Sequence, residues 1–419
     1  MTRGRDNRKA TGLRRIVGVL DIGTSKIACL IAAVDLSGVR ILGVGLQRAE
    51  GVKAGVIIDL DRAEYAARAA LAQAENMARV ELTEVAVSVS CGRLKSHNFT
   101  ARVDVASGLV QEADVRRLMQ AGQNYVEQSG RSLVHMNEVA VRLDGAPGSK
   151  DPRGMAARSL AFDLHAVTAD EAPLRNLLMV VQRCYLEPAS HVPAAYASGL
   201  AVVSEDERRF GVTVIDMGAG TTSLAMFADD RFLYAGATPM GGAQITFDIA
   251  RALHTPLAEA ERIKALYGTV VCAPSDEHDA FSYPTAGEED GVMYQMTKAE
   301  LAEVIRPRVT AICHQLRQRL DECEMTAYAG RSLVLTGGTS GLTGLADFMA
   351  AELGRPVRVG APQSVDGLPR EFSSSAYATV VGLLIAEAQG AAGRRVYRNR
   401  GDDSEGYLKR VGSWLREGF

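Results

Sequence analysis

Two short stretches of the chain place an aspartate just before a glycine-containing turn. Residues 17–26 read VGVLDIGTSK and residues 212–221 read VTVIDMGAGT, so Asp21 and Asp216 each lie two residues before a glycine. In both stretches a run rich in Val and Ile precedes the aspartate, and a second apolar run follows the turn. Such runs around a turn of Gly with Ser or Thr are typical of β-hairpins. The repeated pattern predicts two related hairpins in two related halves of the chain.

These turns have the composition of a phosphate-binding site. Glycine has no Cβ, so backbone N–H groups can come within hydrogen-bonding distance of phosphate oxygens. A third turn, TGGTSG at residues 336–341, lies between a strand-like run and a helical pattern at residues 345–353. Hydroxyl groups and a lysine beside the turns add further donors. The predicted phosphate-side residues are Gly23, Thr24, Ser25, Lys26, Gly218, Ala219, Gly220, Thr221, Thr222, Gly337, Gly338 and Thr339.

The two hairpin aspartates suggest a metal ion. Asp21 and Asp216 would lie beside the same phosphates, and these negative charges repel strongly in a partly desolvated cleft. Mg²⁺ removes the repulsion, because it is bound through one or two carboxylates, phosphate oxygens and water. The alternative is that the turns are purely structural, since a single Asp-x-Gly hairpin carries little functional information. Two copies and a later Gly-Gly turn favour the nucleotide-binding interpretation.

Other segments indicate how these turns are positioned. Small residues lie on one face of two predicted helices, residues 193–199 and 375–382, and allow a close helix crossing between domains. Between the first hairpin and the first of these helices, residues 85–166 form a predicted α/β module inserted into the first half. Its predicted elements are strands at residues 85–89, 99–105, 134–143 and 160–167 and a helix at residues 114–128.

Bulk composition limits the class of protein. The 419 residues are 47% hydrophobic and 23% charged with a net charge of −3, as expected for a soluble protein with two or more domains. Residues 1–14 form a predicted disordered basic tail, and the apolar run after it is too short for a signal peptide. No run is long enough to span a bilayer. Scattered cysteines without a CxxC pair indicate reduced thiols in the cytosol.

The C-terminal segment, residues 406–419, is predicted to be an amphipathic helix that follows a flexible polar linker at residues 386–405. Its apolar face has no obvious protein partner. Trp and Tyr suit the headgroup region of a membrane, and basic residues favour anionic lipid. The alternatives are docking on the protein or fraying. The predicted membrane-binding residues are Tyr407, Leu408, Lys409, Arg410, Val411, Trp414, Leu415, Arg416 and Phe419.

Together the motifs resemble the actin-like ATPase superfamily, which includes actin, heat-shock chaperone ATPases and sugar kinases. LTGG at residues 335–338, LAEVI at residues 301–305 with the nearby Pro307 and Arg308, and RVGAP at residues 358–362 resemble the FtsA family of bacterial cell-division proteins. This resemblance covers nearly the whole chain. It implies a mixed α/β, ribonuclease H-like duplicated fold of two domains, in which the hairpins clamp the phosphates and the Gly-Gly turn faces the adenosine.

The resemblance also implies a division into domains. Residues 15–84 and 167–199 would form the first actin-like domain, residues 85–166 its inserted subdomain, residues 200–243 and 304–385 the second actin-like domain, and residues 244–303 a small subdomain. Adenine would lie near Glu261 and Lys264, with Gly241 and Gly242 on the phosphate side. The alternative for Glu261 and Lys264 is an ordinary surface ion pair.

The implied function is cell division. A member of this family would bind ATP and Mg²⁺, polymerise, and tether FtsZ to the cytoplasmic side of the inner membrane at midcell as a peripheral protein. The C-terminal peptide of FtsZ would bind near Arg306 and Arg308, and the inserted module would contact later division proteins. We expect no nucleic-acid partner. ATP hydrolysis would be weak, because the position nine residues before Gly199 holds Ser190 instead of Gln or Glu.

Two enzymatic alternatives remain open at this point. A small-molecule kinase of the same superfamily would need an aspartate as base toward a substrate hydroxyl, and we find no distinct candidate beyond the two hairpin aspartates. A chaperone ATPase would need a substrate-binding β-domain after the nucleotide domain, and the sequence contains none.

Overall fold

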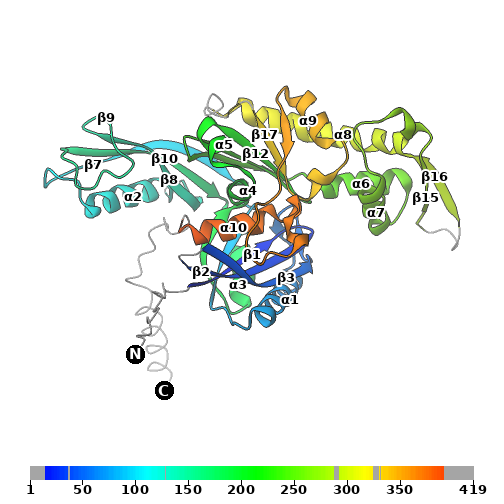
Figure 1. Ribbon diagram of the computed structural model, residues 1–419, viewed down its shortest axis with the longest axis horizontal. Coiled ribbons are helices and arrows are strands. Elements are labelled where there is room, and N and C mark those ends of the chain that lie inside the picture. The colour runs from blue at the N-terminus through cyan, green and yellow to red at the C-terminus, as the bar shows by residue number, and fades with distance from the viewer. Residues whose placement is uncertain are drawn as a thin grey trace, which may run out of the picture.

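The computed structural model describes residues 15–35, 38–127, 129–286, 292–323, 330 and 332–390. The basic tail at residues 1–14, most of the predicted linker and the predicted membrane helix at residues 406–419 lie outside the described residues. Two five-stranded sheets form the centre of the molecule, and two smaller bodies extend to either side of it (Figure 1).

The first sheet has the strand order β11-β6-β1-β2-β3. β1 and β2 form the first predicted hairpin, in which residues Arg15 to Ile22 pair antiparallel with Val34 to Ile27, while β6 and β11 run parallel to β1. Helix α1 (Leu60–Ala78) packs on β2 and β3 through a face of alanines. The strands are β1 (Arg15–Ile22), β2 (Lys26–Asp35), β3 (Gly38–Arg48), β6 (Glu84–Val89) and β11 (Glu187–Pro193); β4 (Val52–Lys53) and β5 (Val56–Ile57) form a small separate hairpin.

The second sheet repeats this arrangement. Its order is β14-β13-β12-β17-β18, with an antiparallel hairpin of β12 and β13 and two parallel strands beyond β12. The predicted duplication of two hairpins is therefore confirmed. The strands are β12 (Val212–Met217), β13 (Thr222–Ala228), β14 (Arg231–Thr238), β17 (Leu333–Thr336) and β18 (Val357–Val359), and helices α5 (Glu205–Phe210) and α9 (Leu345–Leu353) pack nearby.

The inserted module has its own sheet and its own core. Its strand order is β7-β10-β8-β9, and helix α2 packs on that sheet around Leu118, Leu160 and Leu164. One expectation is wrong: the strand predicted at residues 85–89 is β6, which pairs with β1 and β11 in the first sheet and not with the module. The module elements are β7 (Lys95–Asp104), α2 (Glu112–Glu127), β8 (Ser132–Leu143), β9 (Ala146–Pro147) and β10 (Ser159–Ala169).

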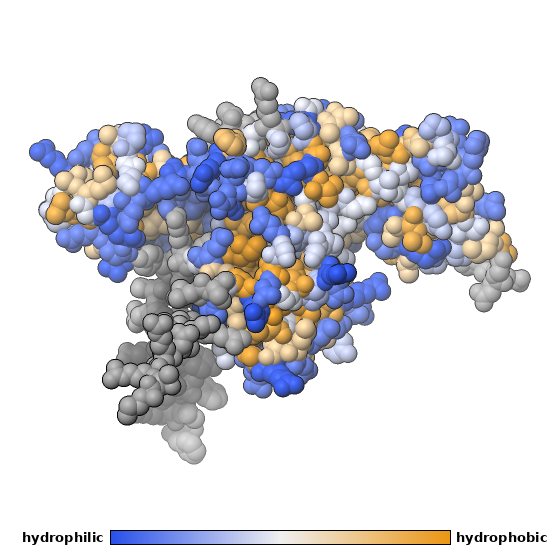
Figure 2. All heavy atoms as spheres, viewed as in Figure 1, coloured by the Kyte–Doolittle hydropathy of each residue, from blue (hydrophilic) through white to orange (hydrophobic). Residues whose placement is uncertain are grey.

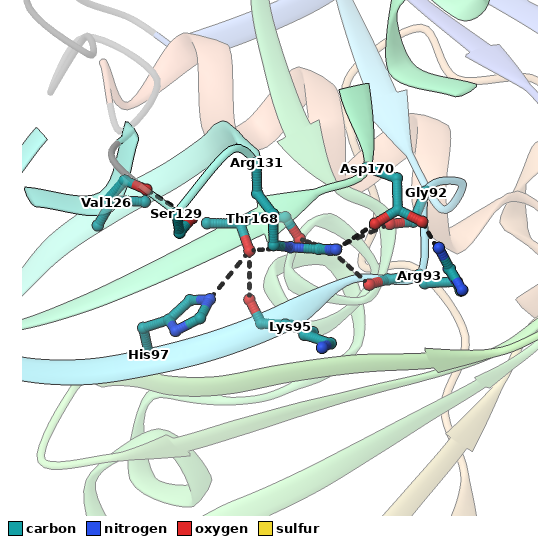
Figure 3. A network of polar contacts seen from close by, with 9 residues as sticks. All are labelled: Gly92, Arg93, Lys95, His97, Val126, Ser129, Arg131, Thr168 and Asp170. Carbon is teal, nitrogen blue, oxygen red and sulfur yellow. Dashed lines mark hydrogen bonds and ion pairs between the residues drawn. The ribbon is translucent and has the colours of Figure 1, made fainter. Parts of the chain in front are cut away.

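Two chain crossings join the module to the first half, and we call them the neck (residues 91–93 and 168–170). Arg131, at the start of the module sheet, reaches both crossings (Figure 3). Its guanidinium donates to the carbonyl oxygens of Gly92 and Arg93 at 3.2 and 2.8 Å and to the Thr168 hydroxyl at 2.9 Å, and it pairs with the Asp170 carboxylate. A single side chain therefore cross-links the two strands of the neck.

Two helices cross between the halves. α4 (Ala194–Val202) and α10 (Ala378–Ala388) pack so closely that a Cβ on Gly382 would overlap the carbonyl oxygen of Ala197. The predicted close crossing is confirmed, although the second segment begins as a 3-10 turn, η5 (Ser375–Tyr377). α10 packs on β1, β2 and β6 of the first sheet, whereas α4 packs on β12 and β13 of the second. The expected end of the second domain at residue 385 is therefore wrong, because the chain returns to the first half at α10.

A small subdomain projects from the second half, opposite the inserted module (Figure 1). It contains the hairpin of β15 and β16, and residues 287–291 between these strands are outside the described ranges. α8 is one continuous helix across the boundary expected at residue 303, because Thr297 caps its start and Pro307 does not interrupt it. The elements are α6 (Gly242–Leu253), α7 (Leu257–Tyr267), η1 (Pro274–Glu277), β15 (Ala280–Pro284), β16 (Met293–Thr297) and α8 (Lys298–Asp321).

Surface hydropathy follows this arrangement. On the face shown in Figure 2, hydrophilic residues cover much of the inserted module, and hydrophobic residues gather near the centre of the molecule. The largest hydrophobic cluster includes Val17, Val214 and Leu383 and thus runs from the first sheet through α10 to the second sheet. The halves therefore share apolar contacts beside the helix crossing.

Candidate nucleotide-binding cleft

A cavity of about 450 Å³ lies between the two halves. Both hairpin turns, the Gly-Gly turn and helix α7 contribute to its walls, so residues more than 300 positions apart in the chain meet there. The predicted residues that line it are Asp21, Gly23, Thr24, Ser25, Lys26, Asp216, Gly218, Ala219, Gly220, Thr221, Glu261, Lys264, Gly337, Gly338 and Thr339.

Three of the predicted nucleotide-binding residues are not on the cavity wall. Thr222 is fully buried and donates its hydroxyl to the carbonyl oxygen of Met240. Gly241 and Gly242 lie behind the second hairpin turn, where the Gly242 N–H donates to the carbonyl oxygen of Gly218 at 3.0 Å. These residues support the turn from behind.

The two hairpin turns have the same local geometry. The Gly23 N–H donates to the Lys26 carbonyl oxygen at 3.0 Å, and the Gly218 N–H donates to the Thr221 carbonyl oxygen at 2.9 Å. Equivalent bonds in both turns follow from the repeated sequence pattern. The backbone at each turn is held in place on either side of the cavity.

The Gly-Gly turn requires glycine at Gly337 for two reasons. Its φ angle is +87°, a conformation that residues with a Cβ rarely adopt. A Cβ at this position would also overlap the Asp216 carboxylate. Gly337 therefore lets the turn after β17 lie directly against the aspartate of the second hairpin.

The two aspartates face the cavity, Asp216 from a buried position and Asp21 from a partly buried one. Asp21 accepts a hydrogen bond from the Ser88 hydroxyl at 2.5 Å, and Asp216 accepts from Ser198 and from Thr379. Burial is the main cause that raises the pKa of both aspartates, while these hydroxyls and the charge of Lys26 act in the opposite direction. Burial lowers the pKa of Lys26, and the two carboxylates oppose that shift.

This donor set fits a bound divalent cation. Two carboxylates converge on the cavity beside the ammonium group of Lys26, and their mutual repulsion raises the pKa of Asp21 further. A cation between them would favour the ionised forms of both. Among the residues that the structure describes, no group of three or more His, Cys, Asp and Glu side chains could hold a metal ion. The two carboxylates of Asp21 and Asp216 match Mg²⁺, which is usually bound through one or two carboxylates and keeps several waters.

Glu261 and Lys264 line the cavity on α7. The Lys264 ammonium donates to the Glu261 carboxylate at 2.7 Å, to the Thr246 hydroxyl at 2.7 Å and to the Gly242 carbonyl oxygen at 3.1 Å. The Lys264 side chain is 13% exposed and that of Glu261 is 58% exposed. The pair is therefore more than a solvated surface contact, because Lys264 joins α7 to the start of α6 at the cavity wall.

The position chosen by counting back from Gly199 is not in the cavity. Ser190 lies on β11, and its hydroxyl donates to the Glu387 carboxylate. The residue at the start of α4 that does line the cavity is Ala194. Counting along the sequence failed because residues 190–193 belong to a strand and not to the helix.

Arg306 and Arg308 lie on α8 and are both engaged within the protein. Arg306 donates to the Val270 carbonyl oxygen at 2.8 Å, and Arg308 forms two bonds of 2.7 and 3.0 Å with the Asp248 carboxylate. About a third of each side chain is exposed. They are therefore partly accessible, while their guanidinium groups hold α8 against neighbouring elements.

The sequence patterns missed three hydroxyl groups beside the aspartates: Ser88, Ser198 and Thr379. Each is a lone polar residue in an apolar or small-residue segment, and that is the signal that could have identified it. Within the described ranges, no helix is both long and apolar enough to cross a lipid bilayer.

Comparisons with known proteins agree with this architecture. The family model described as cell division protein FtsA matches residues 213–382, and the model of the SHS2 domain inserted in FtsA matches residues 91–168. The second range begins after β6, in agreement with the strand pairing.

Similar proteins span almost the whole chain. Cell division protein FtsA of Agrobacterium fabrum is 36% identical over 420 residues, which cover 96% of this chain and 95% of the relative. The Escherichia coli protein of the same name is 30% identical over 421 residues, which cover 98% of this chain and 100% of the relative.

Solved structures establish the fold. A PilM–PilN type IV pilus biogenesis complex has a TM-score of 0.62 at 18% identity, over 92% of this chain and 100% of that chain. MreB5 of Spiroplasma citri bound to ADP has a TM-score of 0.54 at 13% identity, over 91% and 99%. The fold is therefore the actin-like two-domain ATPase fold with an SHS2 module inserted in its first half, and the chain belongs to the FtsA family of bacterial cell-division proteins.

Proposed function

We propose that this protein binds Mg-ATP in the cleft and tethers FtsZ to the inner face of the cytoplasmic membrane during cell division. The observation that supports nucleotide binding is the cavity formed jointly by both hairpin turns and the Gly-Gly turn, with Asp21, Asp216 and Lys26 in its wall. Solved relatives of the fold include MreB5 bound to ADP.

The roles within the cleft follow from residue chemistry. The glycine turns offer backbone N–H groups to the phosphates, and Lys26 offers a positive charge. Asp21 and Asp216 would hold Mg²⁺, which neutralises phosphate charge when bound. Glu261 and Lys264 would lie on the adenosine side, because they line the cavity on α7 and not on one of the glycine turns.

Hydrolysis is expected to be slow. The start of α4 presents Ala194 to the cavity, and an alanine cannot orient an attacking water. ATP would then act mainly as a ligand that stabilises one conformation or one assembled state.

A kinase is less well supported by the cavity. Among the described residues that line it, the carboxylates are Asp21, Asp216 and Glu261. The first two are assigned to the metal, and the third is paired with Lys264. A base toward a substrate hydroxyl is therefore not apparent in this wall.

The membrane and partner roles rest on family membership and on the sequence. The amphipathic segment at residues 406–419 would lie on anionic lipid, the small subdomain with Arg306 and Arg308 would receive the FtsZ C-terminal peptide, and the SHS2 module would contact later division proteins. A single short helix binds a membrane weakly, so polymerisation of the protein would strengthen attachment by multivalency.

The test combines lipid and nucleotide binding. Vesicles that contain phosphatidylglycerol are sedimented with the full chain, or with a chain that ends at Glu405, in the presence and absence of ATP and Mg²⁺. We expect the full chain to pellet with the vesicles and the shortened chain to remain in the supernatant. Equal pelleting of the two would contradict the membrane tether, and no measurable ATP binding by the full chain would contradict the nucleotide site.

A further inference from the structure

Asp216 is held by hydroxyl groups from two different helices. Its Oδ2 atom accepts from the Ser198 hydroxyl of α4 and from the Thr379 hydroxyl of α10, the latter at 3.0 Å. The two hydroxyl oxygens are themselves 3.0 Å apart. Ser198 is fully buried and Asp216 is 7% exposed, so bulk water cannot easily replace these donors.

The Ser198 hydroxyl has three possible acceptors and can donate to only one of them. A serine hydroxyl has one hydrogen, yet Ser198 Oγ lies near the Asp216 carboxylate, near Thr379 Oγ1 and 3.0 Å from the carbonyl oxygen of Ala194. An ionised carboxylate is the strongest acceptor of the three. Ionised Asp216 therefore takes the hydrogen of Ser198 as well as that of Thr379.

The Thr379 contact joins the two halves of the molecule. Asp216 is on β12 of the second sheet, whereas α10, which carries Thr379, packs on β1, β2 and β6 of the first sheet. The equivalent aspartate of the first half differs, because Asp21 accepts from Ser88 on β6, in the same sheet. Only one of the two predicted metal ligands is thus oriented from the opposite half.

We infer that Ser198 and Thr379 are positioning residues for the divalent cation, which fix the orientation of the Asp216 carboxylate and thereby make metal binding depend on the α4–α10 crossing. This inference rests on the proposed Mg-ATP function. Both hydroxyls contact Oδ2, and Gly337 lies against the same carboxylate, so the rotation of this side chain is restricted from three directions.

The alternative is a structural role, in which the hydroxyls only fill polar positions inside the crossing. The two roles differ in what magnesium does. A structural role affects every ligand of the cleft alike, whereas a positioning role affects only the part of ATP affinity that depends on the metal.

The experiment measures the dissociation constant of ATP by calorimetry in excess Mg²⁺ and in EDTA, and takes their ratio as the magnesium enhancement. We expect Ser198→Ala and Thr379→Val each to lower this enhancement by about tenfold, as for the loss of one hydrogen bond to a charged group. Affinity in EDTA should stay within about twofold, since the glycine turns and Lys26, which are the proposed phosphate contacts, are unchanged in both variants. Asp216→Ala provides the reference for loss of the carboxylate itself.

Two controls separate the hydroxyl from other effects. Thr379→Ser keeps the donor and should keep the enhancement. Thr255→Val removes a buried hydroxyl that donates to the Pro284 carbonyl oxygen in the small subdomain, and should also keep it. The inference would be overturned if Ser198→Ala and Thr379→Val kept the magnesium enhancement, or if they weakened ATP binding equally in Mg²⁺ and in EDTA. Either result would leave the proposed Mg-ATP function standing. No ATP binding by the unaltered chain would overturn the inference together with the proposed function.

Discussion

Arg131 and Asp170 form a largely buried ion pair at the neck of the inserted module, with side chains 15% and 21% exposed. The Nη2 group of the guanidinium binds the other crossing of the neck at the carbonyl oxygens of Gly92 and Arg93 (Figure 3). The Asp170 carboxylate also accepts from Arg93, and its pKa is lowered because these arginines outweigh the effect of burial. The two crossings of the neck are therefore linked to each other by side chains and are not two independent linkers.

Replacing Arg131 by Met should loosen this joint. The change leaves Asp170 without the Arg131 guanidinium and removes the donor to the carbonyl oxygens of Gly92 and Arg93. Breaking such a buried pair costs about 3 kcal/mol. We expect faster hydrogen exchange of backbone amides in β7 and β10, measured by mass spectrometry. Arg142→Met is the matched control, because Arg142 forms a more exposed pair with Asp163 in the same module and should change stability by about 0–1 kcal/mol. Equal exchange in the two variants would show that the neck does not depend on Arg131.

Replacing Gly382 by Ala should destabilise the crossing of α4 and α10. The new methyl group would overlap the backbone of Ala197, and forcing apart well-packed elements costs about 1–3 kcal/mol. The free energy of unfolding in urea measures the effect. The control is Gly341→Ala, because a Cβ there meets no atom within 4 Å. A stability of Gly382→Ala equal to that of the control would mean that the helices can separate without cost.

His165 predicts a pH dependence of stability. It is completely buried between the module and the second half, near Asn137 and the Phe232 ring. Burial, with smaller contributions from the charges of His135 and His97, lowers the pKa of His165 to about 3. In the unfolded chain this histidine takes up a proton near its ordinary pKa of 6.5, whereas in the folded protein it stays neutral until the pH approaches 3. The free energy of unfolding should therefore decline as the pH falls from 6.5 toward 3.

The measurement is the urea midpoint between pH 8 and pH 5. We expect a shallower decline for His165→Gln than for the unaltered chain, because the variant lacks the proton that the unfolded state takes up. His314→Gln, at an exposed position on α8, should keep the original slope. The same slope in all three proteins would remove His165 as the cause.

The local patterns predicted much of the fold, and the errors have a common physical cause. Hairpins at Asp21 and Asp216 were predictable because each depends on residues that are adjacent in sequence. The strand at residues 85–89 was predicted as a strand and assigned to the wrong sheet, since an apolar run does not specify its pairing partner. α10 was placed in the second domain for the same reason, because only tertiary packing shows that the chain returns to the first sheet.

The candidate site likewise contains residues that the sequence predicted and residues that it did not. The glycine turns are visible in the sequence because backbone geometry requires glycine there, as at Gly337. The hydroxyls that orient the aspartates are not visible, since Ser88 lies 67 residues from Asp21 and Thr379 lies 163 residues from Asp216. Their partners are set by the packing of whole elements, which no spacing rule describes.

Lys264 offers the clearest test of the adenosine side of the cleft. If Glu261 and Lys264 were only a surface ion pair, Lys264→Met would change ATP affinity little, because exposed pairs contribute at most about 1 kcal/mol. The lysine is instead largely buried, with bonds to Glu261, Thr246 and the backbone of Gly242 behind the second hairpin turn. We therefore expect Lys264→Met to weaken ATP binding about tenfold, since a charge-assisted contact at the cavity wall is lost. Arg262→Met removes the neighbouring pair with Glu259 on the same helix, in which the Arg262 side chain is 45% exposed, and should leave the dissociation constant unchanged in the same calorimetric titration. Equal affinities of the two variants would mean that Glu261 and Lys264 do not contribute to ATP binding and that adenine binds elsewhere in the cleft.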